Sequence, residues 1–230
     1  MRSARAIVGT VFEPVSTFRS LADSPRSFVV LLLLIAANLC VPLALSGKIS
    51  ARRAVLAELG EKLSDMSDRD IDEAVTQKQK LVEFAAVAKA VVGPPLLALE
   101  LALVLWLLGR YLRARPRFGP LFSLAAYAQL PLGLRSLGRA AVVASRPQVA
   151  PDELGGLLPS SLHALVHGPV ALGRALSGAD LFLLWTAVLL GIALHAAGKL
   201  PPLRAGLGMA VAYAAFVAVF LVGLPGMAGA

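Results

Sequence analysis

The sequence has one cysteine and few charged residues, and it lacks the common motifs of catalysis. Cys40 cannot form an intrachain disulfide, and its place in an apolar run is typical of a small buried side chain. There is neither a Gly-Lys loop to bind phosphates nor a Gly-x-Ser-x-Gly turn to present a nucleophile. These absences argue against an enzyme and against a bound cofactor, and we expect neither.

Charged residues make up only 16% of the 230 residues, whereas an ordinary soluble domain is about a quarter charged. Hydrophobic residues account for 57%, and the mean hydropathy is +0.75. They form continuous runs, which can satisfy their backbone groups in lipid only as helices. The net charge of +8 does not indicate nucleic-acid binding, because the basic residues are scattered among loops. The composition predicts an all-α, polytopic integral membrane protein.

Five apolar runs are long enough to cross a bilayer. The first would be about 27 Å long as a helix, close to the thickness of the hydrocarbon core. A cleaved signal peptide is the alternative for this run, but both its leader and the run itself are too long. We predict a single domain, residues 1–230, with spans at residues 28–45, 84–108, 119–138, 181–197 and 205–224.

Residues 46–83 form a polar segment with seven Lys or Arg and eight Asp or Glu. Val55, Leu59 and Leu63 recur at helical spacing. A second helix is expected to begin at Ser67, whose hydroxyl can cap the first turn. We therefore predict an extramembrane helical hairpin, which either binds a partner or packs on itself as a solvated pair.

Residues 146–180 are interrupted by Pro and Gly, and we expect them to connect two spans along the membrane interface. His163 and His167 have the spacing of two zinc ligands on one helix face. The Glu of a metalloprotease helix is missing and no third ligand follows. We therefore expect no metal site.

Five spans place the two ends of the chain on opposite sides of the membrane. Four arginines fall within residues 110–117, whereas the seven basic residues of 46–83 are spread over a longer segment. Basic loops close to spans stay in the cytoplasm, and the higher local density of basic residues favours the arginine loop as the cytoplasmic one. We predict a cytoplasmic amino terminus and a carboxyl terminus on the opposite side. Abundant Ala, Leu and Arg suggest a high-GC bacterial coding sequence, and we expect the protein in the inner membrane of a bacterium.

Glu100 is the most informative polar residue, because a carboxylate within a span usually faces protein or a watery cavity. Tyr127 and Gln129 lie at a similar depth, and hydrogen bonds between them and Glu100 are one interpretation. An ion or solute path is the other. Arg135 and Arg139, near the outer end of the third span, either extend to lipid headgroups or recognise a lipid phosphate.

Three stretches of the sequence resemble the Yip family, the Ypt- and Rab-interacting membrane proteins, in its bacterial branch. They are FEPVSTFRSLADSPR before the first span, AYAQLPLGLRSL in the third and DLFLLWTAVLLGIAL at the fourth. The resemblance covers most of the chain and includes the five-span architecture. It implies family-typical structural positions at Pro14, Phe18, Tyr127, Pro131, Phe182, Trp185 and Gly191.

Eukaryotic members of that family look like adaptors of vesicle trafficking that engage prenylated small GTPases. Their long cytoplasmic amino-terminal region has no counterpart in the 27 residues before the first span, which argues against GTPase binding. The resemblance implies a non-enzymatic adaptor or scaffold whose partners are the lipid bilayer and other membrane proteins or further copies of itself. The alternative is a small transporter or channel component using Glu100, although no internal repeat of transporter type is present.

Overall fold

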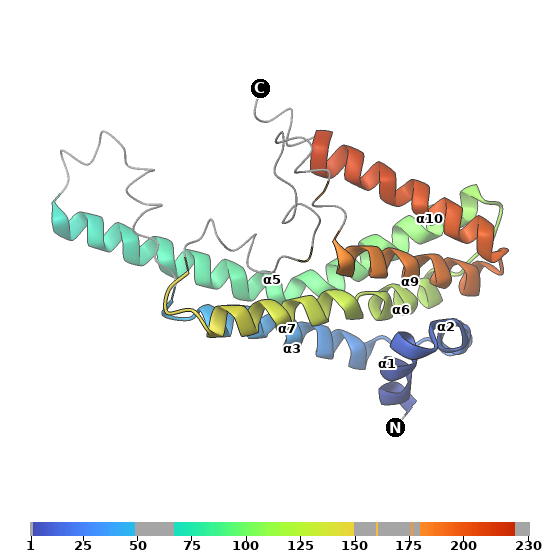
Figure 1. Cartoon of the computed structure of the whole chain (residues 1–230), viewed down its shortest axis with the longest axis horizontal. Helices are drawn as coiled ribbons and strands as arrows, with labels where there is room; N and C mark the ends of the chain where they lie inside the picture. The colour runs from blue at the N-terminus through green and yellow to red at the C-terminus, as the bar shows by residue number, and fades with distance from the viewer. Residues whose placement is uncertain (1, 49–66, 150–159, 161–175, 177–179, 224–230) are drawn as a thin grey trace. The chain divides into compact units, whose positions relative to one another are not determined.

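The structure, a computed structural model, describes residues 2–48, 67–149, 160, 176 and 180–223 (Figure 1). The helices are α1 (Arg2–Phe12), α2 (Pro14–Asp23), α3 (Phe28–Leu45), α5 (Asp68–Tyr111), α6 (Phe118–Ala128), α7 (Leu130–Ala144), α9 (Leu181–Gly198), α10 (Pro202–Phe216) and the π-helix η4 (Val217–Gly223). The all-helical prediction is confirmed for these residues. The first helix of the predicted hairpin, with its apolar stripe at residues 55–63, lies outside them, as do His163 and His167.

Four helices are long and apolar enough to cross a membrane: α3, α5, α9, and α10 with its continuation to Phe220. The bounds of α3 coincide with the first predicted span, and α9 ends one residue beyond the fourth. Each contains an apolar stretch long enough to cross hydrocarbon, and a helix satisfies the backbone groups of that stretch internally. These helices fit an integral membrane protein.

The third predicted span, residues 119–138, is divided between α6 and α7, which have 11 and 15 residues and meet at Gln129. Pro131 accounts for the break, because proline has no N–H to donate and its ring clashes with the carbonyl of Tyr127 four residues earlier. Neither helix alone is long enough to cross a bilayer. The predicted count of five spans is therefore not confirmed.

Helix α5 joins the predicted extramembrane helix and the predicted second span into one helix of 44 residues. It begins as the sequence predicts: the Ser67 hydroxyl accepts from the Asp70 N–H at 3.3 Å, and the Asp70 carboxylate accepts from the Ser67 N–H at 3.2 Å. Beyond its carboxyl end Arg113 has φ 62°, and the Ala114 N–H donates to the Gly109 carbonyl at 2.9 Å. This is the left-handed helix ending that usually uses glycine.

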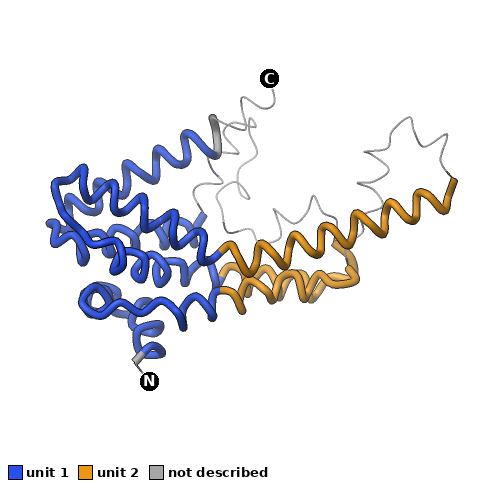
Figure 2. Tube along the Cα trace, turned by 180° about the vertical axis from the view of Figure 1, so that it is seen from behind, with its two compact units in different colours: residues 1–34, 94–134, 159–230 blue, residues 35–93, 135–158 orange. Residues whose placement is uncertain are grey.

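The chain forms two compact units (Figure 2). Unit 1 comprises residues 1–34, 94–134 and 159–230, and unit 2 comprises residues 35–93 and 135–158. In unit 1, α9 packs against α2, α6 and α10, and the core includes Phe18, Leu105 and Tyr127. Unit 2 has a smaller core around Leu45 and Val143. The features described below lie in unit 1 unless stated.

Candidate functional site

The second half of α5 has a packed face and an outer face. Small or apolar residues of the packed face are buried: Pro94, Ala98, Ala102, Leu105 and Gly109. The outer face carries Leu96, Leu99, Leu103 and Leu107, each about half exposed at 47–54%. Glu100 lies on this outer face and is exposed. A carboxylate is therefore surrounded by leucines on the surface of a helix that can cross a membrane.

One interpretation of Glu100, hydrogen bonds to Tyr127 and Gln129, finds no support among the described residues, where no such bond is formed. Tyr127 is fully buried, and within the described residues its hydroxyl has no hydrogen-bond partner. The Gln129 amide donates to the Ala125 carbonyl of its own chain segment at 3.4 Å. Depth in the membrane was estimated from the sequence, but the rotation of α5 directs Glu100 away from the packed face that carries Ala98 and Ala102.

Arg135 and Arg139 lie in unit 2, on α7, and both are half-buried. On the same helix Ser136 donates a hydrogen bond of 3.0 Å to the Asn38 side-chain oxygen of α3. A polar contact of this kind between membrane helices stabilises their packing. The role of the two arginines at lipid headgroups stays a prediction.

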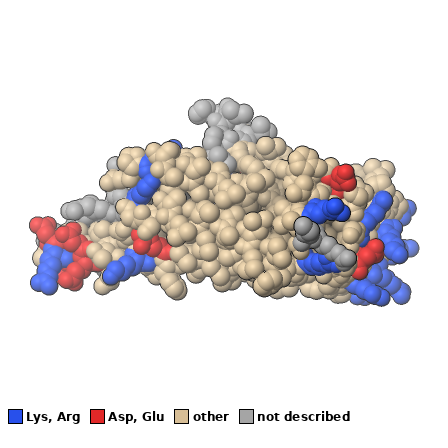
Figure 3. Space-filling view, turned by 90° about the horizontal axis from the view of Figure 1, so that it is seen from below, with Lys and Arg blue, Asp and Glu red and all other residues tan. Residues whose placement is uncertain are grey.

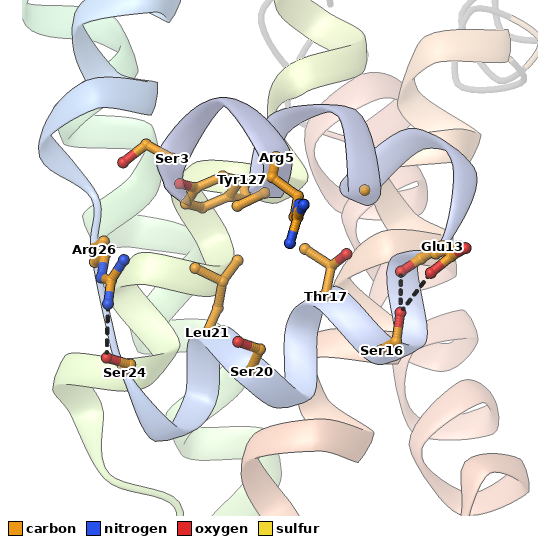
Figure 4. Close-up of a pocket in the computed structure, with 12 residues that line it drawn as sticks. Ser3, Arg5, Glu13, Ser16, Thr17, Ser20, Leu21, Ser24, Arg26 and Tyr127 are labelled. Atoms are coloured by element: carbon orange, nitrogen blue, oxygen red, sulfur yellow. Dashed lines mark hydrogen bonds between the residues drawn. The ribbon is translucent and has the colours of Figure 1, made fainter. Parts of the chain in front are cut away.

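A polar cavity of about 890 Å³ lies between α1 and α2 and reaches Tyr127 of α6 (Figure 4). Its lining contains two arginines, Arg5 and Arg26, and one carboxylate, Glu13. It also contains hydroxyl groups from Ser3, Ser16, Thr17, Ser20, Ser24 and Tyr127. The concentration of hydroxyl and guanidinium donors distinguishes this cavity from the apolar surface of the spanning helices.

Local contacts fix the two ends of this cavity. The Arg26 backbone N–H donates to the Ser123 hydroxyl of α6 at 2.9 Å, and its guanidinium donates to Ser24 at 3.3 Å. At the other end Ser16 donates to the Glu13 carboxylate at 3.2 Å. Figure 4 shows Arg5 directed from α1 toward α2, between these ends. Among the residues that the structure describes, neither arginine forms an ion pair with a carboxylate.

This cavity is not predicted from the sequence, where the residues before the first span indicate a family resemblance but no binding site. A signal was present: Ser16, Ser20 and Ser24 recur every four residues, beside Thr17 and Leu21. Residues at this spacing share one face of a helix. The signal becomes interpretable only when α1 covers that face, as the structure shows.

A second hollow, of about 630 Å³, is an apolar groove between α2, α9 and α10. Gly191 and Gly206 lie along it, and a Cβ atom built on Gly191 would lie 3.8 Å from the Gly206 Cα atom. Arg19 and His195 mark its polar end, with 3.3 Å between Nη2 and Nε2. Figure 3 shows Lys and Arg side chains gathered at the right-hand end, where Figure 1 places α2 and the α9–α10 turn.

The other residues implied by the resemblance have mixed environments. Pro14 is the first residue of α2, and Phe18 of the same helix is fully buried. Pro131 is buried at the start of α7, whereas Phe182 and Trp185 on α9 are half-buried. These residues contribute to packing and to helix geometry. Within the described ranges, no group of three His, Cys, Asp or Glu side chains could hold a metal ion.

Apolar spanning helices, an outward-facing intramembrane carboxylate and a polar cavity at one helix pair define a polytopic α-helical membrane protein. The family model of the Yip1 domain matches residues 8–224, nearly the whole chain. The chain therefore belongs to the Yip1 domain family. No curated protein and no solved structure matches it.

Proposed function

We propose that this protein is a non-enzymatic membrane adaptor that binds another membrane protein through the outer face of α5, centred on Glu100. The exposure of Glu100 among half-exposed leucines is the observation that carries the proposal. Glu100 is 11 residues before the end of α5 at Tyr111, which corresponds to about 16 Å along the helix. That distance is about half the thickness of the hydrocarbon core.

A carboxylate at this depth is unfavourable against lipid by roughly 2.5–3.5 kcal/mol on insertion scales. A partner helix that supplies a hydrogen-bond donor would remove this penalty, and the flanking leucines would supply apolar contact area. Membership of the Yip1 domain family supports a membrane role but not this particular interface.

A second part of the proposal concerns how the chain crosses the membrane. We propose that α6 and α7 together make the third of five passages through the membrane, so that the two termini lie on opposite sides. We further propose that the amino terminus is cytoplasmic. The four arginines within residues 110–117 support this orientation. We place the protein in a bacterial inner membrane, and we propose residues 46–83 as a second surface for partners. A topology reporter fused after Ala230 tests the orientation, and a cytoplasmic signal would contradict it.

The interface is tested by isolating the tagged full-length protein from native membranes in mild detergent, as wild type and as Glu100→Leu and Glu100→Gln. We expect Glu100→Leu to lose the co-isolated partner, by about tenfold or more, because it removes the charged acceptor. Glu100→Gln keeps an acceptor oxygen and should lose less. Since leucine suits lipid better than glutamate, the isolated Glu100→Leu protein should be as stable as wild type or more stable.

Asp23→Asn is the control, because Asp23 is an exposed carboxylate at the end of α2, outside both surfaces proposed for partners. It should leave the partner bound. Two results contradict the proposal. One is full retention of the partner by Glu100→Leu. The other is an ion flux in proteoliposomes that Glu100→Gln abolishes while the partner stays bound, which would favour the transporter alternative.

A further inference from the structure

The Tyr127 hydroxyl is a donor without an acceptor at the inner wall of the α1–α2 cavity. The side chain is fully buried, and among the described residues no group accepts its proton. Most buried polar side-chain atoms are hydrogen-bonded, either to protein or to ordered water. Because Tyr127 lines the cavity, an occupant with an acceptor atom would satisfy it.

The charged groups of the cavity favour an anion. Arg5 and Arg26 contribute two guanidinium groups, while the carboxylate of Glu13 lies at the far end and accepts from Ser16 (Figure 4). Guanidinium groups bind phosphate oxygens strongly, often through two parallel N–H donors. The serine and threonine hydroxyls around them can donate to further oxygens. A phosphate group, with several acceptor oxygens, matches this set of donors better than a carboxylate or a halide.

The cavity lies next to the start of the first spanning helix, and therefore at the level of the membrane surface. Arg26 is two residues before Phe28, where the apolar helix α3 begins. The backbone of Arg26 is held there by its hydrogen bond to Ser123, so the guanidinium extends from a fixed point beside the start of the span. Lipid phosphates occupy this level, and basic pockets next to membrane helices bind them.

We propose that the cavity between α1 and α2 binds the phosphate of an anionic ligand, with Arg5 and Arg26 as its cationic contacts and Tyr127 as a neutral donor. A phospholipid headgroup is the expected source, and a soluble phosphomonoester is the other. This inference is independent of the proposed α5 interface, which uses a different surface of unit 1.

The test uses the full-length protein in micelles of a neutral detergent and follows its melting temperature by size-exclusion chromatography with fluorescence detection. Phosphatidic acid is added in one arm, phosphatidylcholine in a second and sn-glycerol 3-phosphate in a third. We expect phosphatidic acid to stabilise the wild type and phosphatidylcholine to do so far less. Stabilisation by phosphatidic acid alone identifies a lipid headgroup, whereas equal stabilisation by glycerol 3-phosphate identifies a soluble ligand. Both results support a phosphate site.

Variants decide whether the effect arises in this cavity. Arg5→Gln and Arg26→Gln should each weaken the apparent affinity for the stabilising ligand by about tenfold or more, because each removes a charged donor. Tyr127→Phe keeps the ring volume and should weaken it by about threefold to tenfold. Arg69→Gln, on the exposed surface of α5, should leave it unchanged.

Two outcomes overturn the proposal. The first is a wild-type protein whose melting temperature does not respond to phosphatidic acid or to glycerol 3-phosphate. The second is a response of equal size in the wild type and in Tyr127→Phe, which would show that the Tyr127 hydroxyl does not contact the ligand. If Arg26→Gln does not fold, Arg26→Lys replaces it, because lysine keeps the charge but lacks the paired donors of a guanidinium. Unchanged affinity in both single variants, Arg26→Lys and Arg5→Gln, also counts against the site.

Discussion

His195 Nδ1 lies 2.6 Å from the carbonyl oxygen of Leu200, and its other ring nitrogen, Nε2, faces Arg19 Nη2 at 3.3 Å. A carbonyl only accepts and a guanidinium only donates. The neutral imidazole with the proton on Nδ1 therefore satisfies both neighbours at once. His195 joins the end of α9, the turn to α10 and the side of α2.

The first prediction concerns this histidine. His195→Ala should lower the free energy of unfolding by about 1 kcal/mol, because it removes the hydrogen bond that holds the Leu200 carbonyl. His195→Asn should retain part of the stability, since its amide nitrogen can donate in place of Nδ1. Thermal unfolding in detergent measures both. Equal stability of His195→Ala and the wild type would show that the turn does not depend on this bond.

The second prediction concerns the start of α9. The Asp180 carboxylate accepts from the N–H groups of Phe182 and Leu183 at 2.9 and 3.2 Å, and the Ser160 hydroxyl donates to it. Loss of such a cap destabilises a helix by about 0.5–2 kcal/mol. Asp180→Ala should therefore lower the melting temperature, and Asp180→Asn should recover most of it. An Asp180→Asn protein as unstable as Asp180→Ala would mean that the charge, and not the cap, is required.

The third prediction concerns the contact between α1 and α2. A Cβ atom on Gly9 would overlap the Thr17 hydroxyl, so the two helices approach closely only because residue 9 is glycine. Gly9→Ala should loosen α1 and increase its cleavage in limited proteolysis. Thr17→Ala, which removes the obstructing atom, should restore protection when combined with Gly9→Ala. If the double variant is cleaved as fast as Gly9→Ala, the overlap is not the cause.

The fourth prediction is a stabilising substitution. Arg113 adopts a left-handed backbone conformation after α5, with φ 62°, which is unfavourable for any residue with a side chain. Arg113→Gly should relieve this strain and raise the free energy of unfolding by roughly 0.5–1 kcal/mol. The greater entropy of glycine in the unfolded chain offsets part of this gain. Arg115→Gly is the control at an exposed loop position, and it should not stabilise the protein.

The sequence predicted the bounds of α3 but not the break within the third span. A proline alone does not mark a break, because α3 continues through Pro42 and α5 through Pro94 and Pro95. The bounds of α3 coincide with the predicted span at residues 28–45, because this run contains no charged residue. The third span contains Pro131, and its effect on the backbone of Tyr127 divides the run into α6 and α7. Average hydrophobicity over a window does not detect such a break.

The candidate site was harder to predict, because a depth along a helix does not specify a direction around it. One interpretation had Glu100 facing Tyr127, yet one residue turns a helix by about 100°, and the small residues Ala98 and Ala102 lie on the side that packs inward. These two alanines four residues apart were a usable signal for the packed face. The cavity beside α1 needed a further fact, the pairing of α1 with α2, which no local pattern supplies.

The most direct test of the proposed adaptor role is photo-crosslinking in native membranes from a single position on the outer face of α5. A photoreactive amino acid at Leu103, one turn beyond Glu100, should give an adduct of discrete mass that contains another membrane protein. The same group at Leu105, which is 1% exposed, should give crosslinks within the chain. Adducts from Leu103 that contain only lipid or a second copy of the chain would contradict the adaptor account.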